Sequence, residues 1–327
     1  MAGSGPVGMS APDVTVVIPT RDRWPLLSRT ALRSALGQQH VEHEVVVVDD
    51  GSLDGTAERV DELADPRLRV VRHDRSLGVS RARNAGIAAA RGAWVAFLDD
   101  DDLWAPDKLR IQLDAARESG SEFVYAGAVW VDDELRFLYG HEPPDPLTLA
   151  QAVLRWNVVW GGCSNVLART ELVRGLGGFD EDLSQLGDWD LWIRLALCAR
   201  AARVDDVLVG LVVHGRSMLL VDRRDVFAEF ERLRAKHRTA AERLGGGPDH
   251  VLFARWVAAG HARAGRRGAA ARAYLRGTWH PGNVARAAGA VVGPSAMRAG
   301  SRLLAHMPWR QADRPSAVEP AWLEAYR

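Results

Sequence analysis

Four consecutive aspartates, residues 99–102, follow an apolar run and precede "LWAPDKL". Neighbouring carboxylates raise each other's pKa, so such a run needs a compensating partner. Two aspartates spaced Asp-x-Asp after a buried strand can hold a divalent cation, and their oxygens suit Mg²⁺ or Mn²⁺. A cation held within Asp99 to Asp101 would neutralise the run and bridge a diphosphate. For Asp102 we expect a cap on the following helix, because carboxylates are favourable at helix N-termini.

Other phosphate and metal motifs fit the sequence poorly. The segment "DGSLDGTAERVD", residues 50–61, has the acidic spacing of an EF-hand loop. Four valines precede it, however, where an EF-hand requires a helix. No G-x-G-x-x-G fingerprint follows the first apolar run, and the sequence contains no P-loop motif. These contexts exclude a calcium switch, the common NAD enzymes and the P-loop NTPases.

The aspartate run closes the last of four apolar strands, each followed by an amphipathic helix. Short β-branched runs predict buried strands at residues 14–18, 44–48, 67–73 and 93–98. The predicted helices are residues 25–36, 54–64, 78–90 and 106–118. This alternation predicts a mainly parallel sheet with helices on both faces. Ligands bind beyond the carboxyl ends of such strands, so the polar turns after the first, second and fourth strands should meet at one rim.

The regular alternation of apolar strands and amphipathic helices ends after Glu122. Alternation around a "DDE" turn predicts a hairpin in residues 123–140, and a helix follows at 147–156. A second amphipathic helix is predicted at residues 187–201, before a last strand at 205–217. From Arg223 onward the sequence is typical of helices, interrupted at "GGGPD", "AGRRG", "HPGN" and "GPS".

Length, charge and cysteine content narrow the class of protein. A chain of 327 residues is long enough for one α/β domain and an appendage. The 42 basic residues balance the 42 acidic ones, which gives no sign of a nucleic-acid partner. Cys163 and Cys198 cannot form a disulfide framework, which favours a reducing compartment, the cytoplasm. Residues 1–13 lack the pattern of a secretion signal, and we expect them to be flexible.

Residues 250–310 contain ten arginines and no Asp, Glu or Lys. A solvated helix face explains this composition most simply. The alternative is peripheral contact of this region with an anionic lipid surface, at the inner face of the membrane.

Six fragments occur in one order along residues 14–217: "VVIPTRDR", "VVVVDDGSLDGT", "GVSRARNAGIAAARGAWVAFLDDDDLWAPDKL", "GGFDE", "GDWDLWIRLA" and "HGRS". In this ordered set the sequence resembles the family 2 glycosyltransferases. The resemblance implies an α/β GT-A (Rossmann-like) fold, with a mixed, mainly parallel sheet flanked by helices. It places a catalytic domain at residues 14–222 and a helical, Arg-rich C-terminal region at residues 223–327.

The resemblance also implies a nucleotide-sugar site. Asp49 would contact the base, Asp100 the ribose and Arg83 the diphosphate. A carboxylate can accept the imide N–H of uracil, which favours a UDP-sugar, although thymine presents the same edge. A turn cap at Asp49 and a helix-surface salt bridge at Arg83 are the alternatives. The predicted donor-site residues are Pro19, Thr20, Arg21, Asp49, Arg83, Asp99 and Asp100.

For the reacting groups, the resemblance implies a metal at Asp101, with His214 reaching the metal or the diphosphate. It assigns the catalytic base to Asp188, which would take the proton of the acceptor hydroxyl. Gly187 replaces the acid that usually precedes this base. A helix N-cap is the alternative for Asp188, and Asp190 is expected to be solvated or salt-bridged.

On the acceptor side we expect Trp160 and Trp189, because tryptophan can stack on a sugar face. Of the two tryptophans in the 187–201 helix, we expect Trp192 to point inward and Trp189 to lie nearer the cleft.

The resulting hypothesis is a Mn²⁺- or Mg²⁺-dependent, inverting glycosyltransferase of the hexosyltransferase class. Its partners would be a nucleotide-sugar donor and a glycan, lipid-carrier or small-molecule acceptor. Two alternatives stay open: a catalytically silent nucleotide-sugar binding protein and a sugar nucleotidyltransferase. The second would be expected to carry a glycine-rich loop after the first strand, where "PTRDRWP" has no glycine.

Overall fold

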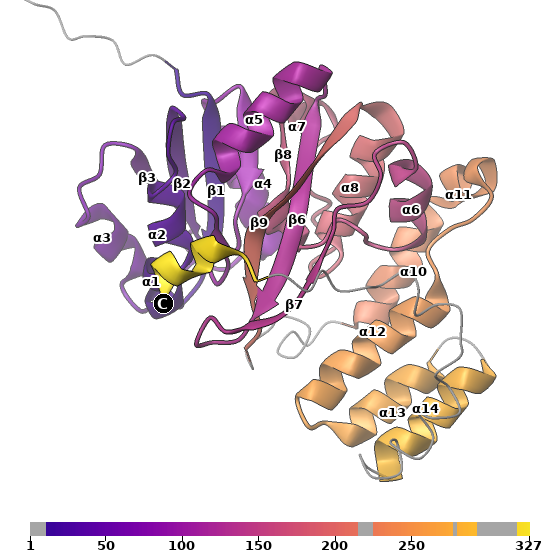
Figure 1. The fold of residues 1–327 in the computed structure, drawn as a ribbon. Helices are drawn as coiled ribbons and strands as arrows, with labels where there is room; N and C mark the ends of the chain where they lie inside the picture. The colour runs from indigo at the N-terminus through magenta and orange to yellow at the C-terminus, as the bar shows by residue number, and fades with distance from the viewer. Residues whose placement is uncertain (1–10, 215–224, 277–279, 293–318) are drawn as a thin grey trace, which may run out of the picture.

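A nine-stranded sheet forms the centre of the computed structural model, which describes residues 11–214, 225–276, 280–292 and 319–327 (Figure 1). The strand order is β3-β2-β1-β4-β8-β6-β9-β5, and β7 pairs with β6. The first four strands are parallel, and antiparallel β8 joins them to the parallel pair β6 and β9. The strands are β1 Val14–Thr20, β2 His43–Asp49, β3 Leu68–Arg72, β4 Trp94–Phe97, β5 Leu103–Trp104, β6 Phe123–Val131, β7 Phe137–His141, β8 Leu167–Arg169 and β9 Ala201–Val212.

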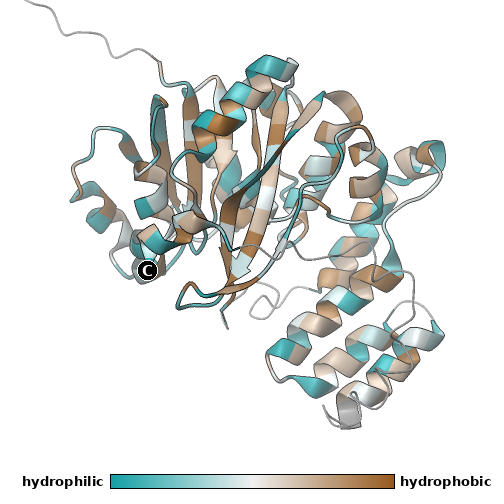
Figure 2. Cartoon of the chain, viewed as in Figure 1, coloured by the Kyte–Doolittle hydropathy of each residue, from teal (hydrophilic) through white to brown (hydrophobic). Residues whose placement is uncertain are grey.

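The central strands are apolar because helices cover both of their faces. Successive side chains of a strand point to opposite faces. In β1, Val17 joins one hydrophobic cluster, whereas Val16 and Ile18 join the other. Figure 2 shows these strands as the brown interior of the molecule. The doubly covered sheet predicted from the continuous apolar runs is therefore confirmed.

Helices follow the first four strands in the order that the sequence predicts. Helix α4 packs so closely on the sheet that a Cβ at Gly86 would lie 2.2 Å from the Val17 side chain. The described helices of this part are α1 Trp24–Arg29, α2 Ala31–Leu36, α3 Thr56–Asp61, α4 Val79–Ala89, α5 Lys108–Ser119, α6 Leu149–Arg155, the 3-10 helix η1 Gly162–Asn165, α7 Thr170–Gly175 and α8 Gly187–Cys198.

The segment predicted as one helix at residues 25–36 forms two helices, α1 and α2, because the helical conformation is interrupted at Thr30. Thr30 has φ −111° and ψ −86°, outside the helical region. Its hydroxyl lies 2.8 Å from the carbonyl oxygen of Leu26 and 3.1 Å from that of Asp100. The break thus brings a side chain to the backbone of the aspartate run.

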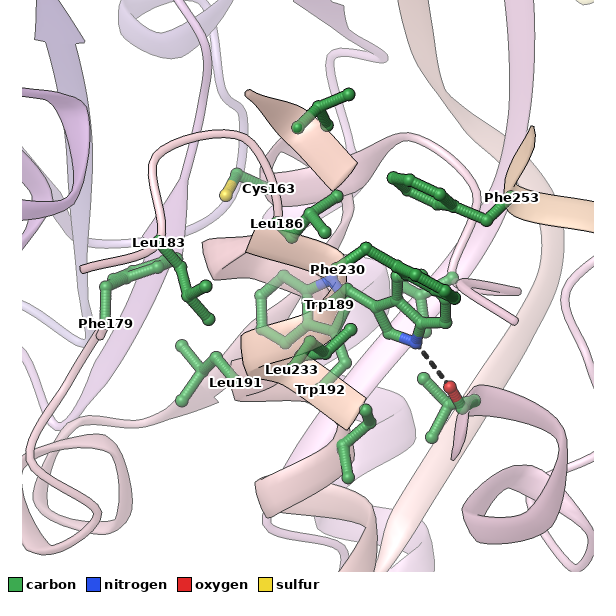
Figure 3. Packing of buried hydrophobic residues seen from close by; sticks show 14 of the residues in the cluster. Cys163, Phe179, Leu183, Leu186, Trp189, Leu191, Trp192, Phe230, Leu233 and Phe253 are labelled. Atoms are coloured by element: carbon green, nitrogen blue, oxygen red, sulfur yellow. Dashed lines mark hydrogen bonds between the residues drawn. The ribbon is translucent and has the colours of Figure 1, made fainter. Parts of the chain in front are cut away.

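The C-terminal helices lie beside the sheet, next to α8 and α6 (Figure 1). They are α10 Val226–Lys236, α11 Arg238–Leu244, α12 His250–Arg263, α13 Arg267–Leu275 and α14 Pro281–Val292. Helices α10 and α12 pack on α8 through one hydrophobic cluster (Figure 3). The ring of Trp189 lies 6.0 Å from that of Phe230 and 6.5 Å from that of Phe253. The helical C-terminal part predicted from the sequence is present. The predicted boundary at residue 222 and most of the predicted N-terminal segment lie outside the described residues.

The last nine residues return to the sheet, an arrangement that the sequence did not predict. The 3-10 helix η3, Ala321–Tyr326, lies at the edge formed by β9 and β5 (Figure 1, yellow). Trp322 Nε1 donates to the carbonyl oxygen of Val207 at 2.7 Å, and Leu323 is fully buried. Within the described residues, the helices are too short or too polar to cross a membrane.

Candidate active site

A cleft of about 1000 Å³ opens at the carboxyl ends of β1 and β4 and extends to α12. Its size is enough for a nucleotide sugar together with part of a second ligand. Every predicted site residue except Asp49 lies on its wall. These wall residues are Pro19, Thr20, Arg21, Arg83, Asp99, Asp100, Asp101, Trp160, Asp188, Trp189 and His214. Residues from strands far apart in the sequence are thus brought to one rim.

Asp100 and Asp101 are held by one arginine. Arg23 Nη1 lies 3.0 Å from Asp100 Oδ1 and 3.1 Å from Asp101 Oδ2. The Thr20 hydroxyl donates to Asp100 Oδ2 at 2.8 Å. His214 Nε2 lies 2.8 Å from Asp101 Oδ2. The repulsion within the run is therefore already reduced by protein groups on β1, its following turn and the end of β9.

The outer two aspartates have different partners. Arg83 Nη2 donates to Asp99 Oδ1 at 2.6 Å. Burial lowers the pKa of Arg83, but Asp99, Cys163 and Asp188 together outweigh it and raise that pKa. Ser164 Oγ donates to Asp102 Oδ2 at 2.5 Å, and the Val212 amide donates to Asp102 Oδ1. The predicted helix cap at Asp102 is therefore wrong. Helix α5 begins six residues later, at Lys108, with Asp107 at the N-cap position, and Asp102 instead joins η1 to β9.

Burial and mutual repulsion raise the pKa of two carboxyls in the run. The pKa of Asp100 rises to about 7, mainly through burial and then through Asp101, against the opposing effects of Arg23 and Thr20. Burial also raises the pKa of Asp102 well above its usual value. At neutral pH the Asp100 carboxyl can therefore accept or donate a hydrogen bond, which suits contact with a ribose hydroxyl.

Asp101 and His214 are the candidate ligands for a divalent cation. Among the described residues, no three His, Cys, Asp or Glu side chains are arranged to hold a metal ion. Mg²⁺, however, is usually bound by one or two carboxylates together with substrate phosphates. An Asp101 carboxylate within 2.8 Å of the His214 imidazole fits such a shared site. Arg23, on the same carboxylate oxygen, would have to yield that position.

Asp49 and its neighbour Asp50 have separate environments. Asp49 Oδ1 accepts the Ser52 amide at 2.8 Å, so the turn-capping role is present. Asp49 Oδ2 is buried and accepts no hydrogen bond, and Arg72 Nε is 3.8 Å away. Asp50 lines the cleft, but its two oxygens already accept from the loop at residues 73–78. Spare acceptor capacity therefore lies on Asp49, whose base-binding role stays a prediction.

Asp188 lies half-buried at the start of α8. Its Oδ1 accepts the Trp189 amide at 2.7 Å, and its Oδ2 accepts Asn157 Nδ2 at 3.2 Å. A Cβ at Gly162, which has φ +51°, would lie 3.2 Å from Asp188 Oδ2, so glycine leaves this face of the carboxylate open. Burial raises the pKa of Asp188, against the lowering effect of Arg83. A carboxylate with a raised pKa and an open face can accept a proton from a ligand.

Trp189 is not the acceptor-side residue that we predicted. Its indole is 2% exposed, and its Nε1 donates to the carbonyl oxygen of Val153 (Figure 3). Trp189 belongs to the core that joins α8 to α10 and α12, so it cannot offer a ring face to a sugar. Trp192 is buried as predicted, and Trp160 stays partly exposed on the cleft wall.

Three residues of the site were missed from the sequence. Arg23 could have been found, because it lies in the polar turn after the first strand. Ser164 and Asn157 carry no sequence signal, since 62 and 31 residues separate them from the aspartates that they contact. Asn157 Oδ1 is also buried without a hydrogen-bond partner, directly beside Asp188.

Comparison with known proteins finds glycosyltransferases. The family model described as Glycosyl transferase family 2 matches residues 15–177, about half of the chain. "Succinoglycan biosynthesis protein ExoO" of Rhizobium meliloti is 47% identical over 111 residues, 34% of this chain and 32% of that protein. "UDP-Glc:alpha-D-GlcNAc-diphosphoundecaprenol beta-1,3-glucosyltransferase WfgD" of Escherichia coli is 31% identical over 112 residues, 34% of this chain and 44% of that protein. The matched segments thus span less than half of these relatives.

Solved structures share the fold over most of the chain. S. aureus TarS residues 1–349 with UDP-GlcNAc gives a TM-score of 0.57 at 18% identity, covering 84% of this chain and 79% of that one. The mannosyltransferase PcManGT from Pyrobaculum calidifontis, with GDP-Man and Mn²⁺, gives 0.51 at 24% identity, covering 96% and 86%. These likenesses confirm the predicted GT-A fold. The family match over residues 15–177 shows that the chain belongs to glycosyl transferase family 2.

Proposed function

We propose that the protein is a metal-dependent, inverting glycosyltransferase that moves a sugar from a nucleoside diphosphate, with UDP favoured, to an acceptor hydroxyl. One observation carries the proposal: a single cleft holds both the aspartate run, with Thr20, and the half-buried carboxylate of Asp188. The relatives support it, because TarS binds UDP-GlcNAc and the name of WfgD describes a UDP-glucose donor.

In this mechanism each half of the cleft has its own task. The groups at Thr20 and Asp100 hold the nucleoside, and Arg83 lies beside the diphosphate. Asp188 takes the proton of the acceptor hydroxyl as its oxygen attacks the anomeric carbon. The bond from that carbon to the diphosphate breaks in the same step, so the configuration inverts. A divalent cation at Asp101 and His214 would stabilise the charge of the leaving diphosphate.

Titration calorimetry with UDP, TDP and GDP, each with and without Mn²⁺, tests the donor half. We expect UDP to bind in a metal-dependent way. Asp101→Ala should weaken this binding by about tenfold or more, because the metal loses its carboxylate ligand. Asp107→Ala is the matched control, since Asp107 lies outside the cleft wall.

If no diphosphate binds in the presence of metal, the donor site is wrong. If a nucleotide sugar binds but is neither hydrolysed nor transferred to any of a broad set of acceptors, the protein is a nucleotide-sugar binding protein.

Asn157→Leu tests the support of the base. The variant removes the amide that stabilises ionised Asp188 and the unpartnered Oδ1 beside it. We expect kcat/KM to fall by about 10- to 100-fold, the range for losing a hydrogen bond to a charged group. Because the amide lowers the pKa of Asp188, its loss should move the acidic limb of the pH–rate profile to higher pH. An unshifted limb with unchanged UDP binding would mean that Asn157 has no effect on the base.

A further inference from the structure

Beyond Asp188 the cleft continues between two walls, residues 130–162 and residues 253–264, which we call the acceptor half. On the first wall, Trp130 and Tyr139 stack with ring centroids 4.9 Å apart and planes at 17°. His141 and Trp160 stack at 4.3 Å and 20°. The rings of Trp130 and Trp160 are 6.2 Å apart, so the two pairs form one aromatic surface. All four side chains are partly exposed, which leaves apolar ring surface facing the cleft.

The second wall comes from α12, in the C-terminal helices. It contributes Trp256 and Arg263, and the Arg263 guanidinium lies close enough to the Tyr139 hydroxyl to oppose the rise in the pKa of Tyr139 that burial causes. The end of α12 and the β6–β7 hairpin therefore face the same cleft. The acceptor half is therefore built jointly by the catalytic sheet and the C-terminal helices.

The charge of the acceptor half differs from that of the donor half. The donor half contains the four aspartates of the run, with Arg23 and Arg83 as counter-charges, and Asp188 lies where the two halves meet. Of the described residues that line the acceptor half, Arg263 is the one with a formal charge at neutral pH. Arg263 is exposed on the cleft wall, and among the described residues no carboxylate lies within ion-pair distance of its guanidinium. A guanidinium binds carboxylate and phosphate groups through two parallel hydrogen bonds, so this wall presents a site for an anion beside an aromatic surface.

We propose that the acceptor half binds a sugar that carries an anionic group, a phosphate or a carboxylate. The aromatic surface of Trp130, Tyr139, His141 and Trp160 receives the sugar ring, and Arg263 receives the anion. The inference rests on the proposed function, because it names the acceptor class of the same cleft. It assigns the C-terminal helices a part in choosing the acceptor.

Tryptophan fluorescence measures the binding of a probe directly, because Trp130, Trp156, Trp160 and Trp256 lie on the two walls of the acceptor half. The protein is saturated with UDP and Mn²⁺ to fill the donor half and is then titrated with glucose 1-phosphate, glucuronic acid and methyl glucoside. We expect an anionic probe to bind at least about tenfold more tightly than methyl glucoside. A preference for glucose 1-phosphate identifies a phosphate site, and a preference for glucuronic acid identifies a carboxylate site.

Two variants distinguish the contribution of the Arg263 charge to probe binding from that of the aromatic surface. Arg263→Gln should bring the anionic probes to the affinity of methyl glucoside, whereas Trp160→Ala should weaken all three by a similar factor. The matched control is Arg267→Gln, an exposed arginine outside the cleft wall, which should leave the tenfold preference unchanged.

Equal binding of charged and neutral probes, or binding of none while UDP binds, overturns the inference and leaves the donor site standing. An equal loss in Arg267→Gln and Arg263→Gln also overturns it, because the effect would then be one of general charge. Failure of UDP itself to bind is the distinct result that rejects the proposed function.

Discussion

Replacing Asp188 with asparagine should lower the kcat of sugar transfer by about 10²- to 10⁴-fold, the usual contribution of a general base. The substitution keeps the size of the side chain and an acceptor oxygen for the Asn157 amide, but it removes the site that takes the proton. Release of UDP from a UDP-sugar, with water or an added sugar as acceptor, measures the effect. UDP affinity should stay the same, because the donor contacts predicted here lie on other elements.

Asp205→Asn is the control for Asp188→Asn. It makes the same chemical change at an exposed carboxylate on β9 that pairs with Arg203. Its kcat should equal that of the wild type. An Asp188→Asn protein that retains full kcat would remove Asp188 as the base, and one that loses UDP affinity instead would move Asp188 to the donor side.

Much of the fold follows from the sequence because local patterns and one global rule agree. Continuous valines require burial on both faces, and right-handed crossovers then place the ends of β1 and β4 side by side. This rule brings Thr20 to the Asp100 carboxylate across 80 residues of sequence. The rim of the cleft could therefore be predicted without a structure.

The partners of individual side chains could not be predicted in this way. Asp102 has the local pattern of a helix cap, yet Ser164 and the Val212 amide bind it because η1 and β9 converge there. Trp189 occupies a helical position that could face either the cleft or the core. The decision depends on α10 and α12, whose packing on α8 no local pattern reveals. Tertiary contacts thus override local preference at the points where distant segments meet.

Asp190→Asn should lower the free energy of unfolding by about 3–5 kcal/mol, the range for breaking a buried ion pair. Asp190 is fully buried and meets Arg194, Lys236 and His237, the last two from the end of α10 and the residue after it. An asparagine would leave Arg194 and Lys236 without the carboxylate that they share, and the buried His237 ring without its carboxylate partner. The expected loss is large because the network fastens the C-terminal helices to α8, the helix that carries Asp188. Chemical denaturation monitored by circular dichroism measures it.

The control for this change is Asp180→Asn, because Asp180 pairs with the same Lys236 but is partly exposed. We expect it to cost less than about 1 kcal/mol, as exposed ion pairs do. Equal effects of the two variants would show that the network contributes no more than a surface pair.

The pH dependence of stability gives an independent measure of the same network. Burial raises the pKa of Asp190, but the His237 hydrogen bond, the Arg194 charge and Lys236 outweigh it and hold the pKa at about 2, below the usual 3.8. A lowered pKa means that the stabilisation is complete above about pH 4 and is lost as the pH falls towards 2. The shift corresponds to about 2 kcal/mol. The amide that Asp190→Asn introduces does not titrate between about pH 4 and pH 2, so only the wild type loses stability in this range. The difference in the free energy of unfolding between wild type and Asp190→Asn should therefore fall by about 2 kcal/mol as the pH falls from about 4 towards 2. A constant difference between pH 5 and pH 2 would mean that the Asp190 carboxylate is not what joins the two helices.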